Sequence, residues 1–378
     1  MAITQIPPRG IEPGARRINA QPIIINGDMG VWQRTTGTVT TTGDYVGVDR
    51  FRISEDTDGS FSTQRHTMSN AEFTTTGFGY ALQADCTGTD ASIGATQTAE
   101  ITQKIEAQNL QLLQYGTSNA KNLTLAFWVK SSKTGTYCVA IRKRDSTSYD
   151  IPIEYTISSA DTWEKKVINI SPTAGSTSLI TSSGGVIDNN NGDGLFVVFA
   201  LAIGSDFHGT NNTWVAATKV ATSNQVNWMD STSNDFYLTG VQLEVGEYSA
   251  STLPSFQHET YAANLARCQR YYYKMEVGDG QYFGSGNIDG SNDAQILIQF
   301  PCVMRTSPSS IETNGTGSHY AIRTTSNVTC DAVPVYSNTE LDKAMTIFKK
   351  SSHGITNGAA AFGRSENNTA YLAWSAEL

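Results

Sequence analysis

The residues that could do catalytic chemistry in this chain are scattered rather than grouped into motifs. No HExxH metal motif and no GxSxG nucleophile elbow occurs. Cleavage of a glycosidic bond needs two carboxylates held across the scissile bond, and the 35 Asp and Glu residues offer many pairs of which the sequence selects none. We therefore expect a protein that binds and assembles, not an enzyme. The five histidines lie far apart: His66, His208, His258, His319 and His353.

Oxygen ligands of the kind that calcium prefers are concentrated in residues 188–194, with the sequence DNNNGDG. Asp188, Asn190 and Asp193 are the candidate ligands for a structural calcium ion. The segment departs from an EF-hand loop, because Asp193 takes the place of the glycine in the sixth position and no bidentate Glu follows in register. The alternative, which the Asn and Gly content favours, is a hairpin turn before the strand that starts at Leu195.

Recognition of a sugar would need exposed aromatic rings that stack on pyranose faces, with polar groups that reach the hydroxyls. Trp214 and Trp228 lie in a long polar stretch, residues 210–234, which indicates a loop. They are the candidate glycan-binding residues, and the alternative is that they anchor a subunit interface. Trp32 and Trp128 lie in strand-like segments and are expected in the core.

Composition and charge exclude several classes of protein. Charged residues make up only 16% of the 378 residues, and the formal net charge is −9. The densest positive run, Arg142-Lys143-Arg144, is followed at once by Asp145. Nucleic acid binding by phosphate neutralisation therefore has little support. No apolar run is long enough to span a bilayer, so we expect no membrane insertion.

The five cysteines are widely spaced, and no CxxC pair occurs. We therefore expect free and mostly buried thiols rather than a structural zinc site or a disulfide framework. The start of the sequence, MAITQIPPRG, has no apolar segment of the kind that a signal peptide needs. We therefore expect folding in a reducing cytoplasm and no secretion signal.

Residues 1–22 are expected to form an extended arm, because four prolines exclude a helix or a central strand. Arg9, Arg16 and Arg17 give this arm a local positive charge within an acidic protein. The arm is therefore a candidate for docking on an acidic partner, and the alternative is a disordered N-terminus.

Residues 23–250 predict a mainly β domain, because short alternating or apolar runs are separated by turn residues. Seven or more strands at this spacing favour a jelly-roll β-sandwich of two sheets. The expected strands are 23–25, 49–53, 123–129, 137–143, 164–170, 195–203 and 236–244.

Residues 251–273 predict a linker with one α-helix that connects two domains. Tyr261, Leu265, Cys268 and Tyr272 fall on one face at helical spacing. Residues 274–378 return to a β pattern and predict a smaller C-terminal β domain. Its clearest strand is 294–300, with further candidates at 344–349 and 370–376.

Six segments stand out by their order and spacing, which cover most of residues 23–378. They are residues 24–34 (IINGDMGVWQR), 49–51 (DRF), 236–246 (FYLTGVQLEVG), 266–272 (ARCQRYY), 300–305 (FPCVMR) and 375–378 (SAEL). The N-terminal segments are similar to a jelly-roll module of the kind found in carbohydrate-binding modules, and the later ones to the helix and C-terminal end that follow such modules. Together the segments resemble virion proteins of tailed bacteriophages, of the tail fibre or receptor-binding type.

The resemblance implies a structural protein located in the virion, often a homotrimer, that binds host surface glycan or neighbouring virion proteins. It also implies that the first and last strands of the module pair. In that case Asp28, Asp235 and Glu244 at their ends could hold a structural calcium ion. The position on the particle stays open.

Two alternatives compete with a tail fibre or receptor-binding component. A capsid decoration protein, such as a head fibre or cement protein, would use the same modules facing outward. A polysaccharide depolymerase is disfavoured, because the chain lacks the long repetitive pattern of a β-helix tailspike.

Overall fold

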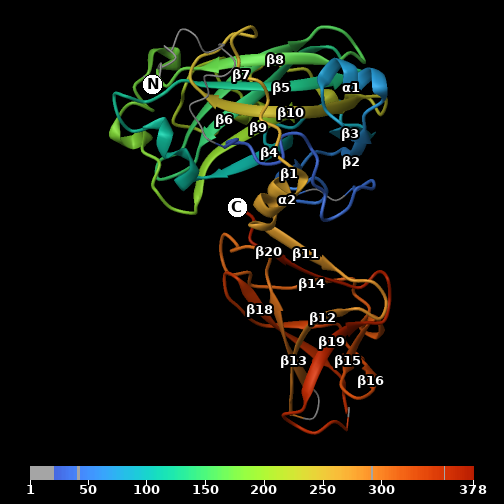
Figure 1. The fold of residues 1–378 in the computed structure, drawn as a ribbon. Coiled ribbons are helices and arrows are strands. Elements are labelled where there is room, and N and C mark those ends of the chain that lie inside the picture. Colours follow the sequence, from blue (N-terminus) through green and yellow to red (C-terminus); the bar gives the residue numbers. More distant parts are fainter. Residues whose placement is uncertain (1–20, 41–42, 291–292, 353) are drawn as a thin grey trace, which may run out of the picture. The chain divides into compact units, whose positions relative to one another are not determined.

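The computed structural model describes residues 21–40, 43–290, 293–352 and 354–378 (Figure 1). The predicted docking arm, including Arg9, Arg16 and Arg17, lies almost wholly outside these residues. The chain divides into two compact units, residues 1–261 together with Leu378, and residues 262–377. Each unit is described by itself.

The first unit is a sandwich of two five-stranded antiparallel sheets (Figure 1). The first sheet has the strand order β1-β4-β9-β6-β7, and the second has the order β2-β3-β10-β5-β8. The strands are β1 (Phe51–Glu55), β2 (Ser60–Thr67), β3 (Tyr80–Gly88), β4 (Thr98–Glu106), β5 (Leu123–Ser131), β6 (Gly135–Lys143), β7 (Tyr149–Ile157), β8 (Glu164–Ile170), β9 (Asp193–Ile203) and β10 (Asp235–Val245).

The strand order is that of a jelly roll, as the sequence predicts. Most consecutive strands cross from one sheet to the other, and only β2–β3 and β6–β7 pair directly with their neighbour in sequence. The connections therefore gather at the two ends of the sandwich, where loops that are distant in sequence meet.

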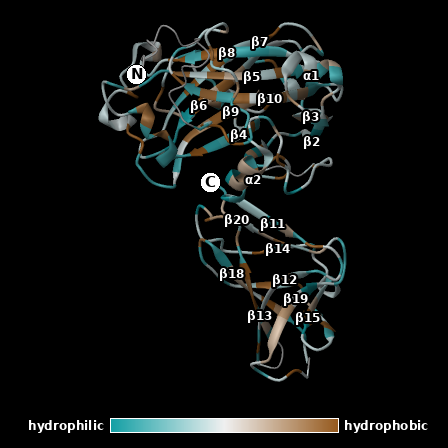
Figure 2. Ribbon diagram, viewed as in Figure 1, coloured by the Kyte–Doolittle hydropathy of each residue, from teal (hydrophilic) through white to brown (hydrophobic). Residues whose placement is uncertain are grey.

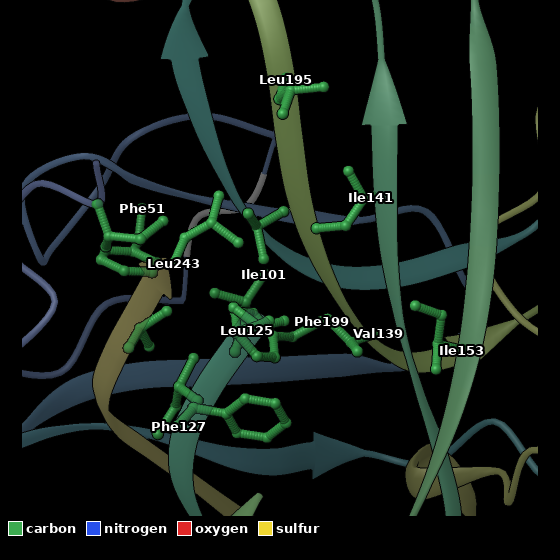
Figure 3. Close-up of a cluster of buried hydrophobic side chains, with 14 of the residues drawn as sticks. Phe51, Ile101, Leu125, Phe127, Val139, Ile141, Ile153, Leu195, Phe199 and Leu243 are labelled. Carbon is green, nitrogen blue, oxygen red and sulfur yellow. The ribbon is translucent and has the colours of Figure 1, made fainter. Parts of the chain in front are cut away.

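The core lies between the two sheets, and Figure 3 shows the apolar side chains that fill it. Alternation along each strand places every second residue inside, so that Phe127 of β5 meets Phe199 of β9 with ring centroids 5.0 Å apart. Tyr155 of β7 contacts the same Phe127 ring at 5.1 Å. Figure 2 shows the corresponding apolar residues along the central strands.

The expected strand at residues 23–25 is wrong, because these residues form bends. Side-chain hydrogen bonds hold this segment, whereas a strand would be held by backbone hydrogen bonds to a neighbouring strand. Asn26 Nδ2 donates to the carbonyls of Val31 and Asp49, and Gln103 holds both backbone groups of Ile25. The segment still meets the last strand at one point, where Val241 N donates to the carbonyl of Gly27 at 2.9 Å.

Most of the other expected strands are confirmed, and 164–170 agrees with β8 at both ends. The sequence analysis did not identify β2, β3, β4 and β7, whose solvent-facing residues are polar and dilute the apolar signal. It also missed the short helix α1 (Asn70–Thr76) and the 3-10 helices of this unit. The 3-10 helices are η3 (Ala107–Leu113), η4 (Ala174–Ser176), η5 (Ser183–Gly185), η6 (Ser205–Phe207) and η7 (Trp228–Asp230).

The second unit is a smaller β domain, as predicted, and begins with the predicted helix, α2 (Tyr261–Gln269). It contains a seven-stranded sheet, β16-β15-β19-β12-β13-β18-β17, and a three-stranded sheet, β11-β20-β14. Its strands are β11 (Tyr272–Glu276), β12 (Tyr282–Asp289), β13 (Asp293–Gln299), β14 (Glu312–Thr313), β15 (Tyr320–Arg323), β16 (Asn327–Thr329), β17 (Val335–Thr339), β18 (Lys343–Lys349), β19 (Ala360–Ser365) and β20 (Tyr371–Ser375), with the 3-10 helix η8 (Gly317–His319).

A cluster of aromatic side chains lies at the centre of the hydrophobic core of the second unit. Trp374 stacks on Tyr273 with centroids 6.0 Å apart and contacts Phe300 at 5.1 Å.

All five cysteines are free, and four are buried, as expected. The boundary between units falls at residue 261, inside the predicted linker of 251–273. Among the described residues, no helix is long and apolar enough to cross a bilayer.

Helix α1 is fixed to the outer face of the second sheet through one carboxylate, that of Glu72. Ser69 and Glu72 form a capping box at the start of the helix. Glu72 Oε1 also accepts hydrogen bonds from Lys130 Nζ at 2.8 Å and from Trp163 Nε1 at 3.1 Å, and His66 Nε2 lies 3.0 Å from Oε2. Burial alone would raise the pKa of Glu72, but these donors together outweigh burial and lower it well below its usual range.

We predict that Glu72→Gln lowers the free energy of unfolding by about 1–3 kcal/mol at pH 7, because charge-assisted hydrogen bonds are lost. A folded-state pKa below the unfolded value of about 4.3 means that this stabilisation is complete above that value and decreases as the pH falls. Urea unfolding should therefore show the difference from the wild type shrinking below about pH 4. Glu340→Gln, at an exposed pair with Lys343, is the control and should change stability by less than about 1 kcal/mol. A difference that is independent of pH would contradict the role of the carboxylate.

Candidate functional site

A cavity of about 240 Å³ lies among the loops at one end of the sandwich in the first unit. Three segments supply its walls: the β3–β4 loop, the end of β9 with the turn after it, and the segment before η7. Two of the lining residues, Ala91 and Ser205, are exposed and lie at the mouth. The lining residues are Ala91, Ile93, Ile203, Gly204, Ser205, His208, Gln225, Val226 and Asn227.

The segment of residues 225–227 is held at both ends by the core. Val226 N donates to the carbonyl of Thr136 at the start of β6, and Gln225 N closes a turn on Thr222. On the other side Trp228 is fully buried, its indole meeting Phe61 edge-on at 5.7 Å and donating to the carbonyl of Asp235. The three lining side chains therefore project from a backbone that the core holds in place.

The other two walls are joined by the close approach of their backbones. Gly204 comes so near to the β3–β4 loop that a Cβ atom on it would lie 2.1 Å from the carbonyl oxygen of Gly94. Asp90, which is buried, holds the same loop by accepting from the backbone N–H groups of Asp58 and Ser92. Its own carbonyl accepts from Asn227 Nδ2 at 2.7 Å, so the loop and the segment before η7 are tied together.

Gln225 is the chemically unusual residue of the cavity. Both Nε2 and Oε1 of its amide are buried, and neither has a hydrogen-bond partner among the described residues. An amide buried in this way costs about 1–3 kcal/mol relative to one that is hydrogen-bonded. Unpaired buried polar groups are rare in folded proteins, and they concentrate at sites that bind another molecule.

The rest of the lining includes one histidine, His208, and part of it is apolar. His208 Nε2 donates to the carbonyl of Ile203 at 2.9 Å, so in the neutral ring Nδ1 is the acceptor. Ile93, Ile203 and Val226 supply the apolar surface, and none of the lining residues is Asp, Glu, Lys or Arg. The cavity can therefore hold an uncharged molecule with mixed polar and apolar faces.

The prediction that the two loop tryptophans bind glycan is wrong. Trp214 and Trp228 are 1% and 0% exposed, so neither ring is available to stack on a sugar. The indole of Trp214 donates to the carbonyl of Ser171 at 2.8 Å. The polar stretch of 210–234 is a loop, as expected, but its large aromatic rings fill the core while the smaller polar residues beside Trp228 line the cavity. The expected core position of Trp32 is confirmed, and Trp128 is half-buried on an outer face.

The two predicted calcium sites have different outcomes. Asp28 follows Gly27, which bonds to Val241, whereas Asp235 lies six residues earlier on β10, or about 20 Å away along an extended strand. A site shared by Asp28 and Asp235 is therefore excluded. Glu244, on the same strand as Asp235, is buried.

The predicted hairpin turn is wrong, because no strand precedes this segment: residues 189–192 are bends that lead into β9, and Asn190 Oδ1 accepts from Gly192 N within them. Asp193 Oδ1 is buried and has no hydrogen-bond partner among the described residues, and Asp188 N donates to the carboxylate of Asp145. No group of three or more His, Cys, Asp or Glu side chains in the described part of the chain could hold a metal ion. Calcium binding by Asp188, Asn190 and Asp193 stays a prediction.

A pair of carboxylates lies outside the cavity, on the outer face of the second sheet. Asp85 of β3 is directly opposite Asp235 of β10. Burial, followed by the charge of Asp235, raises the pKa of Asp85 even though Gln83 Nε2 donates to both of its oxygens. This pair does not line the end cavity.

Comparison with known proteins gives structural likeness only. No family model matches the chain, and no curated protein matches it. A Bacteroides thetaiotaomicron structure described as a candidate sugar-binding protein is 15% identical, with a TM-score of 0.33 over 60% of this chain and 100% of that one. The family 11 carbohydrate-binding module of a Clostridium thermocellum cellulase is 13% identical, with a TM-score of 0.27 over 57% of this chain and 99% of that one.

A third structure is the enzymatically active domain of tailspike protein 4 of bacteriophage CBA120. It is 11% identical, with a TM-score of 0.28 over 59% of this chain and 21% of that one. All three TM-scores are below 0.5, so the jelly-roll assignment rests on the strand order and register of the chain itself.

We predict that Gln225→Met raises the free energy of unfolding by about 1 kcal/mol, because a buried amide without a partner is replaced by an apolar side chain of similar length. The matched control is Gln103→Met, where the amide holds both backbone groups of Ile25. That substitution should lower the free energy of unfolding by about 1–3 kcal/mol. Urea unfolding of both variants measures whether each substitution raises or lowers the free energy of unfolding. Equal destabilisation would show that the amide of Gln225 is satisfied in the folded protein.

Proposed function

We propose that this chain is a non-enzymatic virion component of a tailed bacteriophage, of the tail fibre or receptor-binding type, which contacts host surface glycan through the end cavity of its jelly roll. The observation that carries glycan contact is the lining of the end cavity. It places the polar side chains of His208 and Asn227 beside apolar ones, and this is the combination that a sugar ring with hydroxyls and C–H faces requires.

The position of the cavity supports the same proposal. It is built from loops at one end of a rigid sandwich, where substitutions change binding without disturbing the sheets. The virion assignment has a different basis, namely the resemblance of the segments at residues 24–34, 236–246 and 266–272 to phage structural proteins. Capsid decoration is the alternative on that same basis, and electron microscopy of labelled particles distinguishes the two positions.

Self-association is part of the proposal, because the outer face of the seven-stranded sheet is suited to a second copy of the chain. Phe362, Ser285 and Leu297 lie in register on neighbouring strands, and Phe362 and Leu297 are 45% and 42% exposed. Tyr282, 47% exposed, has its ring 5.3 Å from that of Phe362. This exposed apolar group is of the kind that marks an interface.

The charges on that face favour a copy of the same chain over an unrelated partner. Arg323 is opposite Phe362 and Arg364 is opposite Tyr282, so both cations share the face with the apolar group. Asp293 shares it too, opposite Lys349. A surface that carries both signs can pair opposite charges when it meets another copy of the same chain.

We expect an array of bacterial O-antigen, capsular and peptidoglycan-derived saccharides to retain the wild-type protein on at least one glycan. Ala91→Trp, which places a large ring at the mouth of the cavity, should abolish retention. Thr89→Trp, on the same loop but outside the lining, should keep it. Failure of the wild type on the whole array, or retention of Ala91→Trp, would contradict the proposed glycan site. New reducing ends in a bound polysaccharide would contradict the absence of catalysis.

Light scattering at micromolar concentration should give about three times the chain mass of 40.8 kDa, the trimer that the resemblance implies. Leu297→Glu should reduce this mass to that of a single chain, because a carboxylate would be buried in the apolar contact. Leu112→Glu, at a leucine 43% exposed in the first unit, is the matched control and should leave the mass unchanged. A wild-type monomer would contradict self-association.

A further inference from the structure

We infer that the end cavity binds one terminal sugar residue, at the end of a glycan chain or of a side branch, and excludes the interior of a chain. The inference rests on the proposed function, since it names the part of a glycan that a contact in this cavity would take. It is carried by the three walls of the cavity, which hydrogen bonds join to one another on every side.

The β3–β4 loop and the turn after β9 are joined along their backbones. Gly204 N donates to the carbonyl of Gln97 at 2.8 Å. Asp206 N donates to the carbonyl of Ala95 at 3.0 Å. A Cβ atom on Gly204 would lie 2.4 Å from the carbonyl oxygen of Ala95, so the two backbones touch. No sugar ring can pass between them.

The β3–β4 loop is also joined to the segment before η7. Asn227 Nδ2 donates to the carbonyl of Asp90 at 2.7 Å, and Asp90 N donates to the carbonyl of Met229 at 2.9 Å. Asp90 is buried, so these bonds lie inside the protein rather than at its surface. The second corner of the cavity is therefore closed.

The turn after β9 meets the chain that leads into the same segment. Gly209 N donates to the carbonyl of Ala221 at 2.8 Å. Val220 N donates to the carbonyl of Phe207 at 2.9 Å. From there the chain runs on into residues 225–227, which line the cavity. The three walls therefore form a closed ring, and a ligand enters through the mouth.

A closed ring of walls distinguishes the positions of a sugar within its chain. An internal residue carries a neighbour on each side and would need two openings, whereas a terminal residue needs one. The volume of 240 Å³ corresponds to about eight water molecules at about 30 Å³ each. It lies below the range of about 300–1,000 Å³ that sites for larger ligands occupy. The cavity therefore admits a single residue, and the rest of the glycan stays outside.

Two polar groups of the lining are left for the hydroxyls of that residue. Ser205 is exposed, and its hydroxyl has no hydrogen-bond partner in the described part of the chain. His208 gives its Nε2–H to the carbonyl of Ile203 at 2.9 Å, so Nδ1 of the neutral ring can accept from a hydroxyl. Ile203 and Val226 offer apolar surface to the C–H face of the sugar ring. One residue is therefore enough to engage both kinds of contact.

The test is competition for the full chain on an immobilised polysaccharide that the glycan array retains, measured by surface plasmon resonance. The competitors are the methyl glycosides, in both anomeric forms, of every sugar in that polysaccharide, together with oligosaccharides of increasing length from its partial hydrolysis. We expect one methyl glycoside to release the protein at a concentration within about tenfold of that of the most effective oligosaccharide. A site for a stretch of chain would instead need several linked residues.

A pair of serine variants tests the placement of the sugar. In Ser205→Ala, the dissociation constant of that methyl glycoside, measured by calorimetry, should rise about threefold to tenfold, because one hydrogen bond to the sugar is lost. Ser183→Ala, at an exposed serine outside the lining, is the matched control and should leave the constant unchanged. Equal constants for the two variants would contradict the contact with Ser205 and the placement of the sugar beside it.

The outcomes separate this inference from the proposed function. Release by longer oligosaccharides but by no methyl glycoside would overturn the inference, and glycan contact would stand as long as Ala91→Trp abolishes retention. Failure of the wild type to bind any glycan on the array would overturn both. The length dependence is measured on the wild-type protein, so it decides the inference even if a variant fails to fold.

Discussion

The packing of Phe127 against Phe199 and Tyr155 is the contact on which the first unit depends. These rings come from strands of opposite sheets, and their edge-to-face geometry sets the sheets at the distance that the remaining apolar residues fill. When the two sheets pack face to face in this way, the loops that connect strands of a jelly roll can lie only at the two ends of the sandwich. The cavity exists because the β3–β4 loop and two parts of the β9–β10 loop are brought to the same end.

The cavity and the core are linked through the residues that join them. Trp228 fills the core and ends the segment that carries Gln225, so the stability of the sandwich is what holds a destabilising amide in position. Asp90 and the close approach at Gly204 fix the opposite walls in the same way. Such a site is preorganised, and little conformational freedom is lost when a ligand enters it.

The two units offer different surfaces. The sandwich presents a small cavity at a loop end, which suits recognition of one sugar. The seven-stranded sheet presents an open apolar face around Leu297 and Phe362 with charges of both signs beside it, which suits association with a second copy. Association of copies would place several copies of the cavity on one assembly, and linked sites bind a repetitive surface far more tightly than single ones.

The sequence by itself determined the mainly β class, the two β domains with their helix, and the strands whose apolar runs are long, such as β5 and β9. Alternation and turn residues are local properties, and a single chain displays them directly. Strands with polar outer residues, such as β4 and β7, escaped detection because their burial depends on partners that are distant in sequence. The same reason explains Trp214 and Trp228: their loop context is local, but only the tertiary structure decides which loop side chains turn into the core. The unpaired amide of Gln225 left no local signal, since only backbones that are distant in sequence enclose it.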